Sequence, residues 1–325
     1  MRFLALLLTL PLMAAEPSPM VIAHRGASGY LPEHTLEAKA MAYAMGAPYL
    51  EQDVVLTKDD VPVVLHDIHV DTISDVASRF PGRARDDGRY YALDFTLAEL
   101  KQLRVTERFN AKTGKPVFPN RFPLGRSHFQ IPTLEEELQM IQGLNQSTGR
   151  KVGIYPEIKQ PAWHRLEGHD ISRIVLPILQ KYGYNSRDDL CYVQCFEYAE
   201  VKRIRQELGW QGRLIMLMGG GGKGSDGTDF DYLRSPQGLA ELKQVADGIG
   251  PAISSIVDNN RQVTDLVAKA HAAGLKVHPY TLRVDELPKF ATSADDLMEL
   301  LFNQAKVDGL FTDFPDVVLR WLERD

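Results

Sequence analysis

Cysteine is scarce in this sequence. Only Cys191 and Cys195 occur among 325 residues, and both fall within residues 190–196, which have the apolar pattern of a buried strand. At ~3.3 Å per residue in a strand, their Cα atoms would lie about 13 Å apart, roughly twice the span of a disulfide. We therefore expect both cysteines to be reduced and to pack in the interior.

An excess of basic residues is also lacking. The 37 lysine and arginine residues are outnumbered by 43 aspartate and glutamate residues, which gives a formal net charge of -6. Proteins that bind nucleic acid or an anionic membrane usually carry a basic surface. We therefore expect no nucleic-acid partner.

Hydrophobic runs are short, and the most continuous one lies near the start of the chain. Residues 3–13 are apolar but too short to span a bilayer, and residues 13–15 offer small side chains for cleavage. We expect residues 1–15 to be a secretory signal peptide that is cleaved near Ala15. The mature chain, residues 16–325, should then be exported without stable insertion into a membrane.

A buried N-terminal helix is the alternative interpretation of the same run. Pro17 and Pro19 disfavour it, because proline breaks a helix directly after the run. No cysteine follows the run to which a lipid could be attached, so the pattern predicts no lipid anchor.

Short strands alternate with helical patterns along most of the remaining chain. Strands are expected at residues 21–23, 49–56, 61–65, 152–155, 190–196, 213–218, 248–256, 276–280 and 309–312. Helices are expected at residues 36–45, 133–144, 170–181, 197–208, 260–273 and 294–304, with a last helix that ends near residue 323. This alternation is typical of parallel β/α units. The strand count, about one more than eight, favours a single-domain α/β fold of the (β/α)8 TIM-barrel type over a shorter doubly wound sheet.

The alternation is interrupted after the third strand. Residues 79–89 are charged and loop-like, residues 96–103 have the pattern of a short helix, and residues 116–123 are rich in proline. Long irregular segments are uncommon between the units of a compact domain. We therefore expect a small insertion at about residues 71–130.

Polar and charged residues gather where the predicted strands end. In a TIM barrel the catalytic residues come from the carboxyl ends of the strands, so these side chains should meet on one rim. The residues concerned are His24, Arg25, Glu51, Asp53, His66, Asp67, Glu157, Lys159, Gln194, His278, Tyr280, Thr312 and Asp313.

Three of the acidic residues have the pattern of a metal site. Glu51 and Asp53 are two residues apart on a strand, so both side chains face the same side and would repel each other without a cation between them. Glu157, from another strand, completes a set of oxygen ligands that suits Ca²⁺ or Mg²⁺. The alternative is an exposed acidic pair, which the core-forming residues on either side of Glu51 and Asp53 disfavour.

The histidines and cations on this rim suggest chemistry on an anion. His24 and His66 are candidates for the general acid and the general base, although a lone histidine at a strand end is more often structural. Arg25 and Lys159 suit a phosphate group, and salt bridges to the nearby carboxylates are the alternative for both. Together with a divalent cation, these residue types suggest a phosphate ester as the substrate.

Residues 219–224 form a glycine-rich run. It matches G-x-G-x-x-G only because it is nearly all glycine, and no clear helix follows it. Lys223 is followed by glycine instead of the serine or threonine that a P-loop needs. We expect a loop at the barrel mouth there and no phosphate site.

Seven motifs run in order over nearly the whole mature chain. They are His24-Arg25-Gly26, Pro32-Glu33-His34-Thr35, Glu51-Gln52-Asp53-Val54, Val64-Leu65-His66-Asp67, Tyr155-Pro156-Glu157-Ile158-Lys159, Val277-His278-Pro279-Tyr280-Thr281 and Gly309-Leu310-Phe311-Thr312-Asp313-Phe314-Pro315. This set resembles the glycerophosphodiester phosphodiesterase family, most closely its periplasmic bacterial members. His34 departs from the many members that have asparagine there, but periplasmic relatives also carry histidine.

The resemblance implies a fold and a reaction. The fold is a TIM barrel with a small insertion after the His-Asp motif. The reaction is hydrolysis of glycerophosphodiesters, such as glycerophosphocholine and glycerophosphoethanolamine, to sn-glycerol 3-phosphate and an alcohol, within glycerol and phospholipid metabolism. The resemblance therefore implies a small-molecule substrate and a protein located in the periplasm. A homodimer is a further expectation.

The resemblance also implies roles for individual residues. Glu51, Asp53 and Glu157 would hold the metal, which in periplasmic members is typically Ca²⁺, with Mg²⁺ as the other candidate. His24 and His66 would be the acid and base pair. A substrate-binding set completes the predicted site: Arg25, Lys159, Gln194 and Tyr280.

Two other functions fit part of the same pattern. A lysophospholipase D or a phospholipase C-like phosphodiesterase would use the same chemistry, but it should also have an exposed apolar collar, to which Phe109 and Trp163 could contribute. A non-catalytic exported binding protein would not need two histidines beside an acidic triad.

Overall fold

The structure is a computed structural model that describes residues 19–324. The predicted signal peptide, residues 1–15, lies outside the described residues. Within residues 19–324, no helix is both long enough and apolar enough to cross a membrane.

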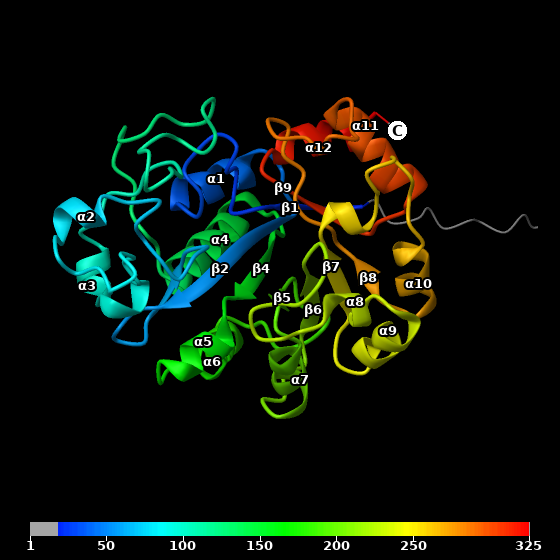
Figure 1. Cartoon of the computed structure of the whole chain (residues 1–325), viewed down its shortest axis with the longest axis horizontal. Coiled ribbons are helices and arrows are strands. Elements are labelled where there is room, and N and C mark those ends of the chain that lie inside the picture. Colours follow the sequence, from blue (N-terminus) through cyan, green and yellow to red (C-terminus); the bar gives the residue numbers. More distant parts are fainter. Residues whose placement is uncertain (1–18, 325) are drawn as a thin grey trace, which may run out of the picture.

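Eight parallel strands surround the centre of the molecule, and helices cover their outer side (Figure 1). The strands are β1 (Met20–Ala23), β2 (Tyr49–Leu56), β4 (Gly153–Ile158), β5 (Tyr192–Cys195), β6 (Arg213–Met218), β7 (Gly248–Pro251), β8 (Lys276–Val277) and β9 (Gly309–Thr312), in the spatial order β8-β7-β6-β5-β4-β2-β1-β9. Hydrogen bonds from Asp308 N to Val277 O and from Phe311 N to Pro279 O connect β8 with β9. The predicted (β/α)8 barrel is therefore confirmed.

The strand in excess of eight is β3 (Pro62–Val64), which pairs antiparallel with β2. The turn between them is too short for the crossover that a parallel neighbour would need. The hairpin therefore extends β2 beyond the barrel without adding a member to it.

Each range that was predicted to be helical contains a helix, although the bounds differ, and several further short helices were not predicted. The helices are α1 (Leu36–Ala44), α2 (Val76–Arg79), α3 (Leu97–Leu100), α4 (Leu134–Thr148), α5 (Pro161–Leu166), α6 (Ile171–Lys181), α7 (Tyr198–Gln206), α8 (Phe230–Leu233), α9 (Pro236–Lys243), α10 (Leu266–Ala272), α11 (Ala294–Met298) and α12 (Pro315–Leu322), with 3-10 turns η1 (Ala92–Asp94) and η2 (Ile253–Ser255) and a π-helical turn η3 (Glu299–Gln304). The expectation that no helix follows the glycine-rich run was wrong, because α8 and α9 lie there.

The start of α9 has ordinary helix signals. Ser235 caps it by accepting a hydrogen bond from Gly238 N, and Pro236 occupies its first turn. Gly238 made the helix hard to predict, because glycine disfavours helix interiors. A Cβ at that position would meet the carbonyl oxygen of Tyr232, so close packing of α9 on α8 requires glycine.

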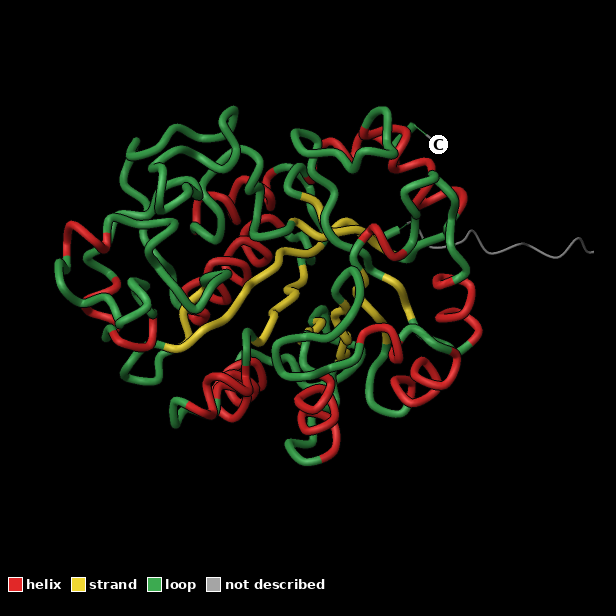
Figure 2. Tube along the Cα trace, in the orientation of Figure 1, coloured by secondary structure: helices red, strands yellow, loops and turns green. Residues whose placement is uncertain are grey.

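The segment between β3 and α4 forms a lobe beside the barrel, coloured cyan to green in Figure 1 and drawn mostly as loop in Figure 2. It has its own apolar cluster, in which Ile73, Phe95 and Leu103 pack near Val63 of β3. The predicted insertion, residues 71–130, falls within this segment. Its bounds remain a prediction.

The barrel interior is filled with large side chains. Tyr49, Tyr155 and Phe311 are buried there, and the Nδ1 atom of His278 lies 2.8 Å from the hydroxyl of Tyr155. His278, which we expected on the rim, therefore lies in the interior. His278 and Tyr280 are two residues apart, so their side chains face the same side. His278 lies one layer deeper, and only Tyr280 lines the cavity.

Cys191 and Cys195 are free and buried, as expected. Both contribute to the main apolar cluster between the barrel and its helices.

Candidate active site

A sharp turn after β1 places the first motif at the mouth of the barrel. Arg25 has φ 59° and Gly26 has φ 89°, so two consecutive residues adopt the left-handed conformation. A Cβ on Gly26 would lie 2.8 Å from the carbonyl carbon of Ala38 in α1, so only glycine fits here. The Arg25 conformation costs about 1–3 kcal/mol, which is typical of functional sites. Its N–H donates to Glu51 Oε2 at 2.8 Å, which ties the turn to β2.

A cavity of about 470 Å³ opens at the carboxyl ends of the strands. Every residue of the predicted site except Lys159 lines it: His24, Arg25, Glu51, Asp53, His66, Glu157, Gln194 and Tyr280. Lys159 lies directly behind the lining, with its ammonium 2.7 Å from Glu157 Oε1. The structure therefore brings the predicted residues together around one space.

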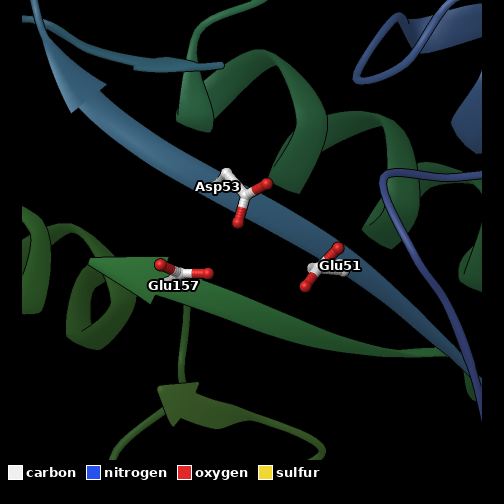
Figure 3. A group of neighbouring side chains, drawn as sticks. All are labelled: Glu51, Asp53 and Glu157. Atoms are coloured by element: carbon white, nitrogen blue, oxygen red, sulfur yellow. The ribbon is translucent and has the colours of Figure 1, made fainter. Parts of the chain in front are cut away.

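The three acidic residues lie close together on β2 and β4 (Figure 3). Glu51, Asp53 and Glu157 each offer an oxygen within 4.8 Å of the others, and all three are buried. Burial, reinforced by the charges of Asp53 and Glu157, raises the pKa of Glu51 well above its usual range. Burial raises the pKa of Glu157 to about 8 even though Lys159 opposes the shift.

These three residues fit a divalent cation. Asp53 Oδ1 is buried and has no hydrogen-bond partner, and such an oxygen normally has one. A cation would supply that partner and cancel the repulsion among the carboxylates. An all-oxygen ligand set suits Ca²⁺ and Mg²⁺ better than softer metals.

A buried chain of charged groups supports Asp53 from behind. His34 Nε2 lies 2.7 Å from Asp53 Oδ2, and Lys39 Nζ lies 3.4 Å from His34 Nδ1. Lys39 also pairs with Glu137 of α4 at 2.8 Å, and both of these side chains are fully buried. Burial alone would raise the pKa of Asp53, but Lys159 and His34 outweigh it and hold that pKa well below its usual range.

His24 is held by a carboxylate from the last strand of the barrel. Its Nδ1 lies 2.5 Å from Asp313 Oδ1, and its Nε2 lies 3.8 Å from Glu51 Oε2. His24, Arg283 and Arg121 hold the pKa of Asp313 well below its usual range against the effect of burial. An ionised carboxylate can only accept, so Nδ1 carries the hydrogen and Nε2 keeps its lone pair.

His66 has the same arrangement with a different partner. Its Nδ1 lies 2.7 Å from Asp67 Oδ1, so its Nε2 is also left for the substrate. Its side chain is 31% exposed, whereas that of His24 is 9% exposed. Burial, followed by the charge of Arg25, lowers the pKa of both histidines to about 4.

The predicted substrate-binding residues also contact protein groups. Arg25 Nη1 donates to Glu33 Oε2 at 2.9 Å, while its buried Nε has no hydrogen-bond partner and lies 3.7 Å from Asp53 Oδ2. Gln194 Nε2 donates to Glu51 Oε1 at 3.0 Å and thereby orients a carboxylate of the acidic triad. The Tyr280 hydroxyl donates to Met218 O at 2.9 Å and is therefore already engaged. The Tyr280 side chain forms part of the cavity wall. The salt bridges that we considered as alternatives for Arg25 and Lys159 are thus present in the structure.

Two arginines behind the histidines were missing from the sequence-based site. Arg108 Nη1 donates to Asp67 Oδ2 at 2.6 Å, and Arg121 Nη2 donates to Asp313 Oδ2 at 2.7 Å. Both come from the irregular segment between β3 and α4, where no periodic pattern indicates which way a side chain points.

Comparisons with known proteins point to one family. The model of the glycerophosphoryl diester phosphodiesterase family matches residues 24–317. A glycerophosphodiester phosphodiesterase of Haemophilus influenzae is 45% identical over 94% of this chain and 90% of its own length. One of Treponema pallidum is 40% identical over 93% of this chain and 91% of its own length.

The fold has a solved counterpart as well. The crystal structure of a candidate glycerophosphoryl diester phosphodiesterase from Silicibacter pomeroyi aligns with a TM-score of 0.71 and 25% identity, over 95% of each chain. The family match spans every residue that lines the cavity, from His24 to Phe311. On these grounds the chain belongs to the glycerophosphodiester phosphodiesterase family of phosphoric diester hydrolases.

Proposed function

We propose that this protein hydrolyses glycerophosphodiesters, such as glycerophosphocholine and glycerophosphoethanolamine, to sn-glycerol 3-phosphate and the free alcohol. The observation that carries the proposal is the pair of histidines, each backed by a carboxylate, that share one cavity with three carboxylates and Arg25. A metal triad alone would serve many hydrolases. Two histidines that both present Nε2 add the proton donor and acceptor that cleavage of a diester needs.

Glu51, Asp53 and Glu157 are the residues that would hold the metal. Ca²⁺ is our first candidate, and Mg²⁺ is the second, because both take oxygen ligands. When bound, the cation supplies positive charge beside the phosphate and favours ionisation of the attacking hydroxyl. The Arg25 guanidinium, whose Nε lacks a hydrogen-bond partner, would offset charge on a phosphate oxygen.

The histidines would move the protons. One Nε2 accepts the proton of the glycerol hydroxyl next to the phosphate, and that oxygen bonds to phosphorus as the bond to the alcohol breaks. The other histidine enters this step as the imidazolium and gives the proton on its Nε2 to the departing alcohol oxygen. Water then opens the cyclic phosphate with the two roles exchanged. Diesters without that hydroxyl should accordingly be poor substrates.

A lipid-directed phosphodiesterase is less well supported. Within residues 19–324, the exposed large hydrophobic side chains are Val117, Leu166, Tyr232 and Val284, which come from four separate segments. Trp163, one candidate for an apolar collar, stacks on Tyr91 instead. Phe109, the other, is only half-exposed. A small, water-soluble diester suits this surface better.

The site of action and the assembly are also part of the proposal. The apolar run at residues 3–13 supports export to the periplasm with cleavage near Ala15. A homodimer is our expectation for the mature protein. N-terminal sequencing of the secreted protein and light scattering of the purified protein test these two points.

The decisive experiment is release of sn-glycerol 3-phosphate from glycerophosphocholine by the mature protein. Activity should disappear on chelation, return with Ca²⁺ or Mg²⁺, and be absent in His66→Ala. His169→Ala is the matched control, because His169 also pairs with an aspartate, Asp60 at 2.6 Å, but lies outside the cavity. Absence of hydrolysis of every glycerophosphodiester tested, in folded protein with either metal added, would overturn the proposal.

A further inference from the structure

We propose that Arg108 and Arg121 are positioning residues through which the segment between β3 and α4 completes the active site. Each arginine binds the free oxygen of the carboxylate that holds a catalytic histidine. The inference rests on the proposed roles of His24 and His66.

Arg108 acts on the more exposed histidine. Asp67 accepts from His66 Nδ1 through Oδ1, at 2.7 Å, and from Arg108 Nη1 through Oδ2, at 2.6 Å. Both carboxylate oxygens are therefore engaged, on opposite sides. The same nitrogen of Arg108 lies 3.3 Å from Thr72 Oγ1, which further fixes the guanidinium.

Arg121 has the equivalent position behind the buried histidine. Asp313 accepts from His24 Nδ1 through Oδ1, at 2.5 Å, and from Arg121 Nη2 through Oδ2, at 2.7 Å. The Arg121 side chain is only 4% exposed. Its guanidinium packs over the Phe118 ring, 3.6 Å from the ring centre, and also binds Asp285.

The repeated geometry has a physical consequence for the histidines. A carboxylate held at one oxygen can still rotate about its Cβ–Cγ bond and can exchange partners with water. When the second oxygen binds an arginine, the carboxylate is fixed, and it then fixes the plane and the tautomer of the imidazole. Catalysis depends on aiming Nε2 at the reacting oxygen, where a small misplacement lowers the rate strongly.

The two arginines should differ in their effects. Arg108 also binds both oxygens of Glu33, at 2.6 and 3.0 Å, and Glu33 in turn holds Arg25. Loss of Arg108 therefore disturbs both a histidine and the predicted phosphate ligand. Asp313, in contrast, has a second arginine, because Arg283 Nε donates to its Oδ2 at 3.0 Å. Loss of Arg121 should therefore be partly compensated.

Arg108→Gln and Arg121→Gln test the proposal, with kcat and KM measured on glycerophosphocholine. We expect Arg108→Gln to lower kcat about 100-fold and to raise KM, and Arg121→Gln to lower kcat about 10-fold at nearly constant KM. Free guanidinium should restore part of the lost kcat in both. Arg89→Gln is the matched control, because Arg89 pairs with Asp71 at 2.8 Å in the same segment but contacts neither histidine. It should keep the kcat of the unmodified protein.

A double variant separates positioning from a general loss of structure. If Arg108 acts on His66 through Asp67, Arg108→Gln combined with Asp67→Asn should have a kcat close to that of Asp67→Asn alone, and the route through Glu33 and Arg25 should appear as a further rise in KM. Independent, multiplicative losses, or unchanged kcat in both arginine variants, would overturn the proposal. Arg108→Lys and Arg121→Lys repeat the measurement if a glutamine variant does not fold.

Failure of this inference is distinguishable from failure of the proposed function. Absence of hydrolysis by the unmodified protein would remove the proposed function, whereas active His24→Ala and His66→Ala variants would remove the histidine roles and this inference together. Inactive histidine variants alongside fully active arginine variants would remove only this inference.

Discussion

The cavity has two walls that come from opposite halves of the barrel. The charged wall comes from β1, β2, the end of β3 and β4, and carries His24, Glu51, Asp53, His66 and Glu157. The other wall follows β5 to β8 and the chain after β8. We call it the apolar wall for its hydrophobic side chains, which are Phe196, Leu217, Ala252, Ile253, Tyr280, Leu287 and Pro288, although polar and charged residues such as Arg283, Glu286 and Lys289 also line it.

The walls are also supported differently. Behind the charged wall, ion pairs extend through His34 and Lys39 to Glu137 of α4, because each buried charge needs a partner. Behind the apolar wall, side-chain packing holds the hydrophobic groups in place. Phe196, for example, contacts the Phe230 and Tyr280 rings edge-on. The contrast suggests that one half of the barrel performs the chemistry and the other accommodates the alcohol.

Removal of one acidic ligand from the charged wall should have the largest effect. Glu157→Gln should lower kcat/KM by about 1,000-fold, since a bound metal supplies several kcal/mol of transition-state stabilisation. Thermal unfolding gives a second measurement, because Ca²⁺ should raise the midpoint of the unmodified protein and not that of the variant. Glu197→Gln, at another buried glutamate outside the cavity, should keep both properties. Equal activity of the two variants would contradict the metal assignment.

Loss of the carboxylate behind His24 should rank second. Asp313→Asn should lower kcat about 100-fold, because the amide no longer fixes the tautomer of the imidazole. Asp308→Asn is the control from the other end of β9, where Asp308 Oδ2 lies 2.8 Å from His271 Nε2. If both variants lost kcat equally, a general effect on β9 would explain the loss.

A change in the apolar wall should have a smaller and different effect. Phe196→Ala should raise KM for glycerophosphocholine about fivefold, equivalent to about 1 kcal/mol of lost contact, with little change in kcat. The ratio of rates on the choline and ethanolamine diesters should change as well. Steady-state kinetics on both substrates give kcat and KM for each. A large fall in kcat at constant KM would show that Phe196 takes part in the chemistry and would contradict the separate roles of the two walls.

A buried histidine outside the cavity should affect stability and leave turnover unchanged. His164 Nε2 accepts from Leu56 N at 3.3 Å, and burial lowers the pKa of His164 to about 4. The unfolded chain binds this proton near pH 6.5, so the stabilisation is complete above that pH and is lost as pH falls toward 4. In urea titrations from pH 7.5 to 4.5, His164→Gln should show a weaker pH dependence by up to about 3 kcal/mol.

The control for that titration is His128→Gln, at an exposed histidine. It should reproduce the pH dependence of the unmodified protein. Loss of kcat in His164→Gln at pH 7.5 would mean that His164 also influences the side chains of the charged wall.

Most of the barrel and most of the charged wall could be predicted from the sequence. The strands have apolar patterns, and parallel strands place their last residues on one rim, so strand position alone was enough to group Glu51, Asp53 and Glu157. The helix expected from residue 133 is α4, which begins at Leu134 behind a capping box of Thr133 and Glu136.

The remaining features depend on tertiary structure. Arg108 and Arg121 lie in irregular chain, whose path is set by packing on β2 and β3. Two inward-facing positions such as His278 and Tyr280 cannot be ranked by depth from alternation alone, and only one of them reaches the cavity. The glycine in α9 concealed a helix whose packing requires it.

The pairing of β1 with β9 also constrains when the enzyme can become active. His24 and Asp313, which share a hydrogen bond, are 289 residues apart in the chain. Contacts of such high sequence separation form slowly, because a long loop must close before they can contribute. A folding intermediate with its helices and most of its strands in place, but with β9 not yet docked on β1, would hold the acidic triad and still lack an oriented His24. If His24 has the catalytic role proposed above, hydrolysis should begin only when the ring of strands closes, and the recovery of turnover during refolding should report that final event.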